Sequence, residues 1–317
     1  MSAKQKYREL CRVDETIPIF SKDWWLDAVC GEENWDALVV ERDGEIAASM
    51  PIYIKKRFGI RYVSGAKLSQ THGIHIRYPA GQKYEKKLGF EKDVMNDLID
   101  QLEKIGVAYY QQNFHYSVQN WLPFYWRGFK QTTRYTSVIT DLTSLSNVFD
   151  DFSKGVRKDI RRAEKEAVVF ETDDLDLFYR LNTRVFERQG LGVPYKYDEI
   201  ERIDNFCKER NSRVMLAARD TDDNVHSIVY MVWDSESAYL LMSGTDPDFR
   251  DSNFKTLLVW EAIKYASTVT KKFDFEGSMM ENVADYFRKF GAILMPYYSI
   301  SKAFRYGLGF ELYGTLR

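Results

Sequence analysis

Two acidic side chains alternate with aromatic residues in one short strand-like run, residues 272–277. Because side chains alternate along a strand, Asp274 and Glu276 are expected on one face of it. A carboxylate pair of this kind can take a proton from a substrate. We expect Glu276 to be the base, with Asp274 orienting it or sharing its proton. The structural alternative is that both acids cap the next helix or pair with Arg288 or Lys289.

A glycine and a serine follow this run directly, at Gly277 and Ser278. They predict a turn with backbone N–H groups and one hydroxyl. Such a turn can bind an oxyanion or a phosphate. It can also cap the following helix, and capping is the preferred interpretation.

A basic stripe is predicted on a helix in the middle of the chain. Lys158 and Arg161 on this stripe are candidates for holding the phosphates of a nucleotide-linked, lipid-linked or tRNA substrate. Interleaved acidic residues leave open a second interpretation, a charged face turned to solvent. The stripe consists of four residues at helical spacing, Lys154, Lys158, Arg161 and Lys165.

Composition indicates an ordinary globular protein with two domains. The chain has 317 residues, of which 44% are hydrophobic and 29% charged, and its mean hydropathy is −0.44. No apolar run approaches the ~18 residues of a membrane span, and the N-terminus has no signal-peptide pattern. We therefore expect a cytoplasmic protein without a membrane span.

Cysteine and histidine usage argues against a disulfide framework and a metal centre. The three cysteines are scattered, and the four histidines show no ligand spacing. We predict no metal cofactor. A net charge of −2 gives no general attraction to nucleic acid, so a polyanion site must be local.

The chain reads as two copies of one unit. Strand-like runs flank turns at residues 42–44 and 222–224, which predicts two hairpins. Each hairpin is later followed by a helix, a strand, a short helix and a last strand, so the fold class is α/β with mixed sheets. These elements are expected at 90–105, 107–114, 120–127 and 129–140 in the first half and at 253–269, 271–278, 282–290 and 292–301 in the second.

A glycine follows an aromatic-rich short helix in both halves, Gly128 in one and Gly291 in the other. Glycine supplies the positive φ with which a helix ends before a strand. The strand pattern breaks between residues 141 and 152, so we expect one domain over residues 1–145 and a second over residues 146–317.

Several segments resemble the Fem family of peptidoglycan-bridge aminoacyltransferases and related acetyltransferase-like proteins of polysaccharide gene clusters, within the GNAT superfold. They are residues 154–165, 178–183 with 188–190, and 273–278 leading to 287–292. The resemblance covers most of residues 150–302 and, more weakly, residues 17–80. It implies two GNAT-like domains in tandem and transfer of an acyl or aminoacyl group to an amine. The first domain would recognise the acceptor, and Glu276 would take the ammonium proton.

The same resemblance identifies a donor-binding loop. GNAT enzymes hold the CoA pyrophosphate in an [Arg/Gln]-x-x-Gly-x-[Gly/Ala] loop at a helix N-terminus. Here Asn253 and Lys255 replace the two small residues, so the expected donor is acyl-CoA or another acyl donor, such as an acyl carrier. Aminoacyl-tRNA is less favoured, because no heptad segment predicts the helical arm of tRNA-dependent members. The residues expected to bind the donor are Arg250, Ser252, Asn253, Lys255 and Ser278.

The resemblance also suggests residues for the amine acceptor, which could be a small molecule or a lipid- or nucleotide-linked compound. Each has an ordinary alternative: the histidine as a satisfied or surface residue, the tyrosine as packing, and the glutamine as part of a helix stop. The candidates are Gln70, His72, Gln189, Tyr297 and Lys302.

Two function hypotheses follow. The first is an N-acyltransferase acting on an amino sugar or an amino-acid-bearing cell-envelope precursor, which the paired acids Asp274 and Glu276 favour. The second is a non-catalytic tandem-GNAT module that binds a phosphorylated glycan or a protein partner, which Asn253 and Lys255 in the donor loop favour.

Overall fold

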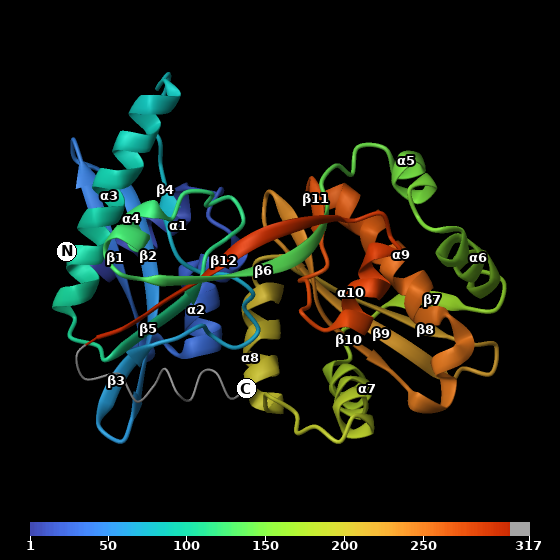
Figure 1. The fold of residues 1–317 in the computed structure, drawn as a ribbon. Helices are drawn as coiled ribbons and strands as arrows, with labels where there is room; N and C mark the ends of the chain where they lie inside the picture. The colour runs from blue at the N-terminus through green and yellow to red at the C-terminus, as the bar shows by residue number, and fades with distance from the viewer. Residues whose placement is uncertain (305–317) are drawn as a thin grey trace. The chain divides into compact units, whose positions relative to one another are not determined.

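The computed structural model describes residues 1–304, without the side chain of Arg250 (Figure 1). The chain forms two compact units. The first contains Met1–Arg134 and the chain from Pro296 onward, and the second contains Tyr135–Met295. Each unit has its own core.

The first unit is built on a mixed sheet. Its strand order is β1-β2-β3-β5-β12, with β4 beside β2. Asp43 and Gly44 both have positive φ, which is the conformation of a two-residue hairpin turn, and they join β1 to β2 as expected. The strands are β1 (Trp35–Arg42), β2 (Glu45–Arg57), β3 (Ile60–Val63), β4 (His75–Ile76), β5 (Tyr109–Asn113) and β12 (Ile293–Ala303).

The longest helix of this unit, α3 (Tyr84–Lys104), packs its second half on the sheet. Val94, Leu98 and Leu102 recur at helical spacing on its buried side and belong to the unit's core. The other helices are α1 (Ala3–Val13), α2 (Asp23–Cys30) and α4 (Leu122–Trp126), with the 3₁₀ turns η1 (Ile19–Ser21) and η2 (Glu32–Asn34).

The second unit has the strand order β6-β11-β10-β9-β8-β7. Only β10 and β11 run parallel, and the other neighbours are antiparallel. The strands are β6 (Lys130–Ile139), β7 (Val168–Glu171), β8 (Arg213–Arg219), β9 (Val225–Trp233), β10 (Ser237–Thr245) and β11 (Lys272–Asp274). The helices are α5 (Leu145–Asp150), α6 (Lys154–Ala163), α7 (Leu175–Arg188), α8 (Tyr197–Lys208), η3 (Pro247–Ser252), α9 (Phe254–Val269) and α10 (Glu281–Arg288).

Two strands pass from one unit to the other. The end of β6 pairs with β11 in the second unit, where Ile139 faces Phe273. The end of β12 returns to the first unit, where Ile300 faces Gln112 of β5. Ile139 and Ile300 are both buried in these cores. The compact units change at residues 134/135 and 295/296, and the division into two domains after residue 145 stays a prediction.

Most predicted elements are present within a few residues of their expected limits. Gly128 and Gly291 both have positive φ and follow α4 and α10, so the expected helix ends are confirmed. The strand expected over 271–278 is wrong in its second half, because β11 ends at Asp274. Across residues 1–304 no helix has both the length and the apolar character needed to cross a bilayer.

A buried ion cluster joins α8 to the sheet of the second unit. Arg213 Nε lies 2.8 Å from Asp204 Oδ1 in ion-pair geometry, and the two side chains are only 5% and 2% exposed. Lys208 Nζ lies 2.8 Å from Asp204 Oδ2, and the hydroxyl of Tyr230 donates to Asp204 Oδ1 at 2.9 Å. Asp204 therefore compensates charge that burial would otherwise penalise.

We predict that Asp204→Ala lowers the free energy of unfolding by about 3–5 kcal/mol, because it leaves Arg213 charged and buried. Urea titration followed by circular dichroism measures this change. The control is Asp173→Ala, which removes a carboxylate that also contacts Arg213 but is 77% exposed. It should cost less than about 1 kcal/mol. Equal losses for the two variants would contradict the role given to Asp204.

Candidate functional site

The candidate acids lie where two parallel strands part. β10 and β11 pair only from Ser237↔Lys272 to Tyr239↔Asp274. β10 then continues to Thr245, whereas β11 ends at Asp274. Diverging parallel strands leave a gap in the ladder, and in α/β sheets ligands bind beyond such carboxyl ends.

Asp274 is held rigidly at this point. Its side chain is buried, and Oδ1 accepts hydrogen bonds from the hydroxyl of Thr136 on β6 and from the backbone N–H of Glu276 at 2.7 Å. These bonds fix the direction in which the chain leaves the sheet. Asp274 is therefore placed to orient the turn that carries Glu276.

Glu276 adopts an unusual backbone conformation, with a φ of 60°. A positive φ is uncommon for residues other than glycine and is often found at functional sites. The strand has already ended here, so strand alternation does not set the direction of the Glu276 side chain. The expectation that alternation places both acids on one face is wrong for Glu276.

The Glu276 side chain is half-buried, with one carboxyl oxygen fully covered. Its Oε1 is buried and has no hydrogen-bond partner among the described residues. Burial, and secondly the negative charge of Asp274, raise the pKa of Glu276 well above its usual value. The structural alternative is also not found: among the described residues no ion pair joins Glu276 to Arg288 or Lys289, and Arg288 pairs with Asp285 at 2.9 Å. A carboxyl group with a raised pKa suits proton transfer near neutral pH.

Gly277 allows the turn to pack tightly against β6. Its φ is 45°, and a Cβ at this position would lie 2.3 Å from Tyr135 O and 2.5 Å from Thr136 Cα. Ser278 follows, and its hydroxyl accepts from the N–H of Met280 at 3.0 Å. Met280 is the N-cap of α10 and has no side-chain bond. The predicted capping by Ser278 is therefore wrong, and its hydroxyl stabilises the turn before the helix.

The predicted donor loop lies at the N-terminus of α9. Asn253 has a φ of 63°, the left-handed conformation that glycine usually supplies, so the loop keeps the bend with a different residue. Ser252 Oγ accepts weakly from the N–H of Phe254 at 3.4 Å. The side chain of Arg250 lies outside the described residues.

Lys255 brings a covered positive charge to this helix start. Burial, and secondly the positive charge of Arg188, lower the pKa of Lys255. Its ammonium lies 5.7 Å from the ring centre of Tyr286. Among the described residues, neither Lys255 nor Arg188 has a carboxylate at ion-pair distance, which makes this spot favourable for an anion.

Stacked aromatic rings clamp the donor loop, a feature that sequence reasoning missed. The His226 ring stacks on Phe249 at 4.0 Å and on Phe254 at 4.3 Å, with interplanar angles of 6° and 15°. His226 Nε2 lies 2.9 Å from Asp220 Oδ2. Phe249 and Phe254 flank the loop, so the imidazole fixes both of its ends. No sequence signal pairs His226 with the two phenylalanines, because it lies far from them along the chain, on β9.

The remaining candidates of the second unit lie outside the turn over residues 274–278 that carries Glu276, which we call the carboxylate turn. Gln189 Nε2 donates to Val185 O of its own helix at 3.1 Å. Lys158 and Arg161 are exposed on α6, whose opposite side packs into the core. The guanidinium of Arg161 lies 5.8 Å from the ring centre of Phe149. Both interpretations of the basic stripe remain compatible with this arrangement.

The candidate acceptor-binding residues of the first unit are buried or make hydrogen bonds within that unit. His72 is buried, its N–H donates to Asn113 O at 2.7 Å, and burial lowers the pKa of His72 to about 4. Asn113 Nδ2 donates to Gln70 O at 3.0 Å. Lys302 Nζ donates to Glu103 Oε1 at 2.9 Å. Tyr297 is buried.

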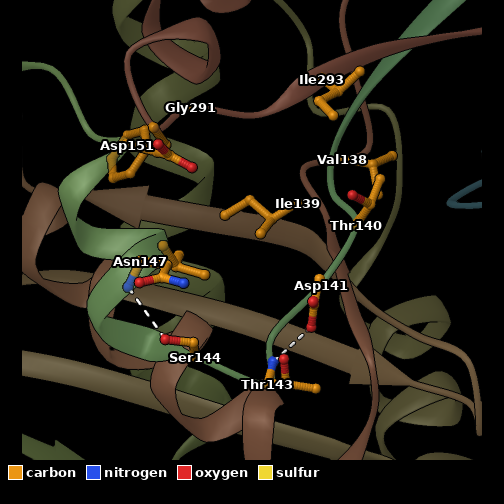
Figure 2. A pocket seen from close by; sticks show the side chains of 12 residues that line it. Val138, Ile139, Thr140, Asp141, Thr143, Ser144, Asn147, Asp151, Gly291 and Ile293 are labelled. Carbon is orange, nitrogen blue, oxygen red and sulfur yellow. Dashed lines mark hydrogen bonds between the residues drawn. The ribbon is translucent and has the colours of Figure 1, made fainter.

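A separate pocket lies at the end of β6 (Figure 2). It has a volume of about 250 Å³ and is bounded by β6, α5 and the turn after α10. Ile139 extends into it, and Ser144 and Asn147 of α5 lie on one side. Its lining includes neither Asp274 nor Glu276 and contains no Lys, Arg or His. This pocket is therefore distinct from the carboxylate turn. Within the described part of the chain, no group of His, Cys, Asp and Glu side chains is arranged to hold a metal ion.

Gly277→Ala tests the close contact between the turn and β6. We expect it to lower the free energy of unfolding by more than about 1 kcal/mol, because the positive φ and the missing space both oppose a Cβ. The control is Gly155→Ala on α6, where the nearest atom to a new Cβ is 4.0 Å away. That change should be neutral or stabilise by up to about 1 kcal/mol. Urea titration measures both, and a harmless Gly277→Ala would argue against the contact.

Glu276→Gln tests the burial of the carboxyl group through the pH dependence of stability. A raised pKa in the folded state means that protonated Glu276 favours folding at low pH. This contribution is lost as the pH rises from the usual value of 4.5 through the raised folded-state pKa. The glutamine variant cannot ionise, so its melting temperature relative to wild type should increase from pH 4 toward neutral pH. A difference that stays constant across this range would contradict a covered carboxyl group.

Residues 150–288 match the family described as "Acetyltransferase (GNAT) domain". No curated protein sequence matches the chain significantly. These residues contain the predicted donor loop, the carboxylate turn and α10.

Solved structures with the same fold cover nearly the whole chain. FemX is 14% identical with a TM-score of 0.70, over 98% of both chains. The C-terminal domain of a putative lysylphosphatidylglycerol synthetase from Agrobacterium fabrum is 10% identical with a TM-score of 0.58, over 99% of this chain and 96% of that one. A tandem GNAT protein from the clavulanic acid biosynthesis pathway is 10% identical with a TM-score of 0.52, over 95% and 94%. The chain therefore has the mixed α/β, tandem-GNAT fold, and its second unit carries a match to the GNAT acetyltransferase domain.

Proposed function

We propose that this protein is an N-acyltransferase that moves an acyl or aminoacyl group to a primary amine, with Glu276 as general base. The observation that carries the proposal is the covered Glu276 carboxyl group, without a hydrogen-bond partner on Oε1 among the described residues, on a strained turn where β10 and β11 part. The match of residues 150–288 to a GNAT acetyltransferase domain supports the same reaction class.

The proposed reaction begins with an acceptor amine that arrives as an ammonium ion. The Glu276 carboxylate takes its proton, and the nitrogen lone pair attacks the acyl carbonyl carbon. The bond from that carbon to the donor's leaving atom then breaks, and the leaving atom takes up the second excess proton from the new amide nitrogen. Glu276 releases the first proton to solvent, which restores its carboxylate. Asp274 acts through Glu276, since it holds the N–H of the turn at 2.7 Å.

The donor site is proposed at the start of α9. Backbone N–H groups of a helix N-terminus bind phosphate, and Lys255 and Arg188 add positive charge that no described carboxylate neutralises. These residues fit a phosphate-bearing donor, which can be acyl-CoA or an aminoacyl-tRNA. Lys158 and Arg161 are proposed as further phosphate contacts.

The acceptor is proposed to be an amino sugar or another amine of a cell-envelope precursor, free or linked to a lipid or nucleotide, modified in the cytoplasm. Support comes from structures of like fold that are named FemX and lysylphosphatidylglycerol synthetase. The first unit is proposed to recognise this acceptor.

A non-catalytic binding module is the second candidate. Asn253 and Lys255 carry side chains at the loop positions where an ordinary GNAT enzyme has small residues. Purified protein incubated with acetyl-CoA, longer acyl-CoAs and charged tRNA separates the two candidates. A donor that raises the melting temperature and is consumed in the presence of an amine supports the enzyme. A donor that raises it without turnover supports the binding module.

For the donor identified in this way, Glu276→Gln should lower the rate of transfer by about 10²–10⁴-fold, because the amide keeps the shape but cannot accept a proton. The donor-induced rise in melting temperature should persist. Glu281→Gln, on the exposed first turn of α10, is the matched control and should keep full activity. Full activity of Glu276→Gln together with loss in Asp274→Asn would reverse the roles of the two acids.

A further inference from the structure

An exposed apolar patch lies on α3 and α4 of the first unit. Tyr84 and Trp126 are 75% and 58% exposed, although large aromatic side chains are usually buried. We define the α3–α4 patch by its five exposed apolar residues: Tyr84, Leu88, Leu122, Tyr125 and Trp126.

The members of the patch form a continuous stripe. Tyr84, Leu88 and Lys92 are four residues apart on α3 and therefore lie on one side of the helix. The Lys92 ammonium lies 5.7 Å from the ring centre of Trp126. Leu122 is one turn before Trp126 on α4 and shares its side. The stripe thus runs along the first turns of α3 and continues over α4.

The first turns of α3 stand clear of neighbouring strands (Figure 1). A Cβ built on Gly89 would meet no atom within 4 Å, which agrees with open space around this part of the helix. The second half of the same helix is packed on the core. A projecting helix end with exposed aromatic residues suits insertion into a soft surface better than the enclosure of a small ligand.

Positive charge accompanies the α3 part of the patch. Lys83, Lys86, Lys87 and Lys92 lie within ten residues that contain two acids, Glu85 and Glu91. Glu91 is buried and accepts from Tyr78 and Asn120, both at 2.8 Å. Glu85 lies 3.9 Å from Lys86 in an exposed pair, which contributes little. The segment is therefore basic, in a chain whose net charge is −2.

We propose that the α3–α4 patch docks on the surface of a membrane that contains anionic lipids. Tyrosine and tryptophan favour the headgroup region of a bilayer, and lysines next to them are attracted to anionic headgroups. Aromatic residues are enriched both in protein interfaces and in the headgroup region, so they do not separate the two partners. Lysine is depleted in protein interfaces, so the lysines next to the patch make a protein partner less favoured. The proposal does not depend on the acyl-transfer proposal, since it rests on the first unit alone.

Vesicle co-sedimentation tests the proposal without an acyl donor. Wild-type protein should bind vesicles of mixed phosphatidylcholine and phosphatidylglycerol and bind pure phosphatidylcholine vesicles at least about tenfold more weakly. Binding should weaken as salt rises, because salt screens the lysine charges. Absence of binding to the anionic vesicles would overturn the proposal.

Two double variants localise the binding. Tyr84→Ser with Trp126→Ser, and Lys86→Glu with Lys87→Glu, should each lower the partition coefficient at least about tenfold. Phe58→Ser is the matched control, because Phe58 is 90% exposed on the turn between β2 and β3. It should bind as wild type does, and equal loss in this variant would overturn the assignment to the patch.

Two further measurements make the outcome decisive. Circular dichroism melts should show that all variants fold as wild type does, since the substituted side chains are exposed or half-buried. Size-exclusion chromatography with light scattering reports self-association. A wild-type dimer that Tyr84→Ser with Trp126→Ser dissociates, without vesicle binding, would overturn the proposal in favour of a contact between copies of the chain.

Discussion

The pairing of β6 with β11 is the contact on which the candidate site depends. It places Val138 opposite Asp274, so the hydroxyl of Thr136 on the same strand reaches the Asp274 carboxylate. It also presents the β6 backbone against which only a glycine fits at position 277. The left-handed turn at Glu276 follows from these contacts, because the chain must leave the sheet between a fixed Asp274 and a fixed Gly277. Displacement of β6 would remove the support for both acids together.

Two acidic side chains of the second unit have opposite electrostatic surroundings. Asp204 is buried with positive partners around it, as expected where burial must be compensated. Glu276 is covered without a positive partner among the described residues, and its neighbour Asp274 adds negative charge. The first arrangement stabilises the fold. The second costs stability, and such a cost is commonly retained where a group must exchange a proton or bind a ligand.

In the predicted donor loop, a tertiary contact stabilises a bend that small residues usually form. Asn253 adopts the left-handed bend that glycine favours, and His226 holds the rings at both ends of the loop. The loop is thus fixed by stacking from a neighbouring strand. Lys255 occupies a position where a small residue would leave open space, and it brings a cation toward the helix start. The arrangement favours an anionic group there but differs from the common GNAT loop.

Local patterns in the sequence determined the fold class and most elements. The Asp43-Gly44 turn, the helical spacing of apolar residues on α3 and the glycines after α4 and α10 act through neighbouring residues, so their effects are visible in the chain itself. The acids Asp274 and Glu276 were predicted as candidates in the same way, from residue type and spacing. Tertiary structure alone decided the exchange of β6 and β12, the end of β11 at Asp274 and the clamp of His226 on Phe249 and Phe254. These features join residues far apart in sequence, and their energies come from packing and pairing that no local pattern records.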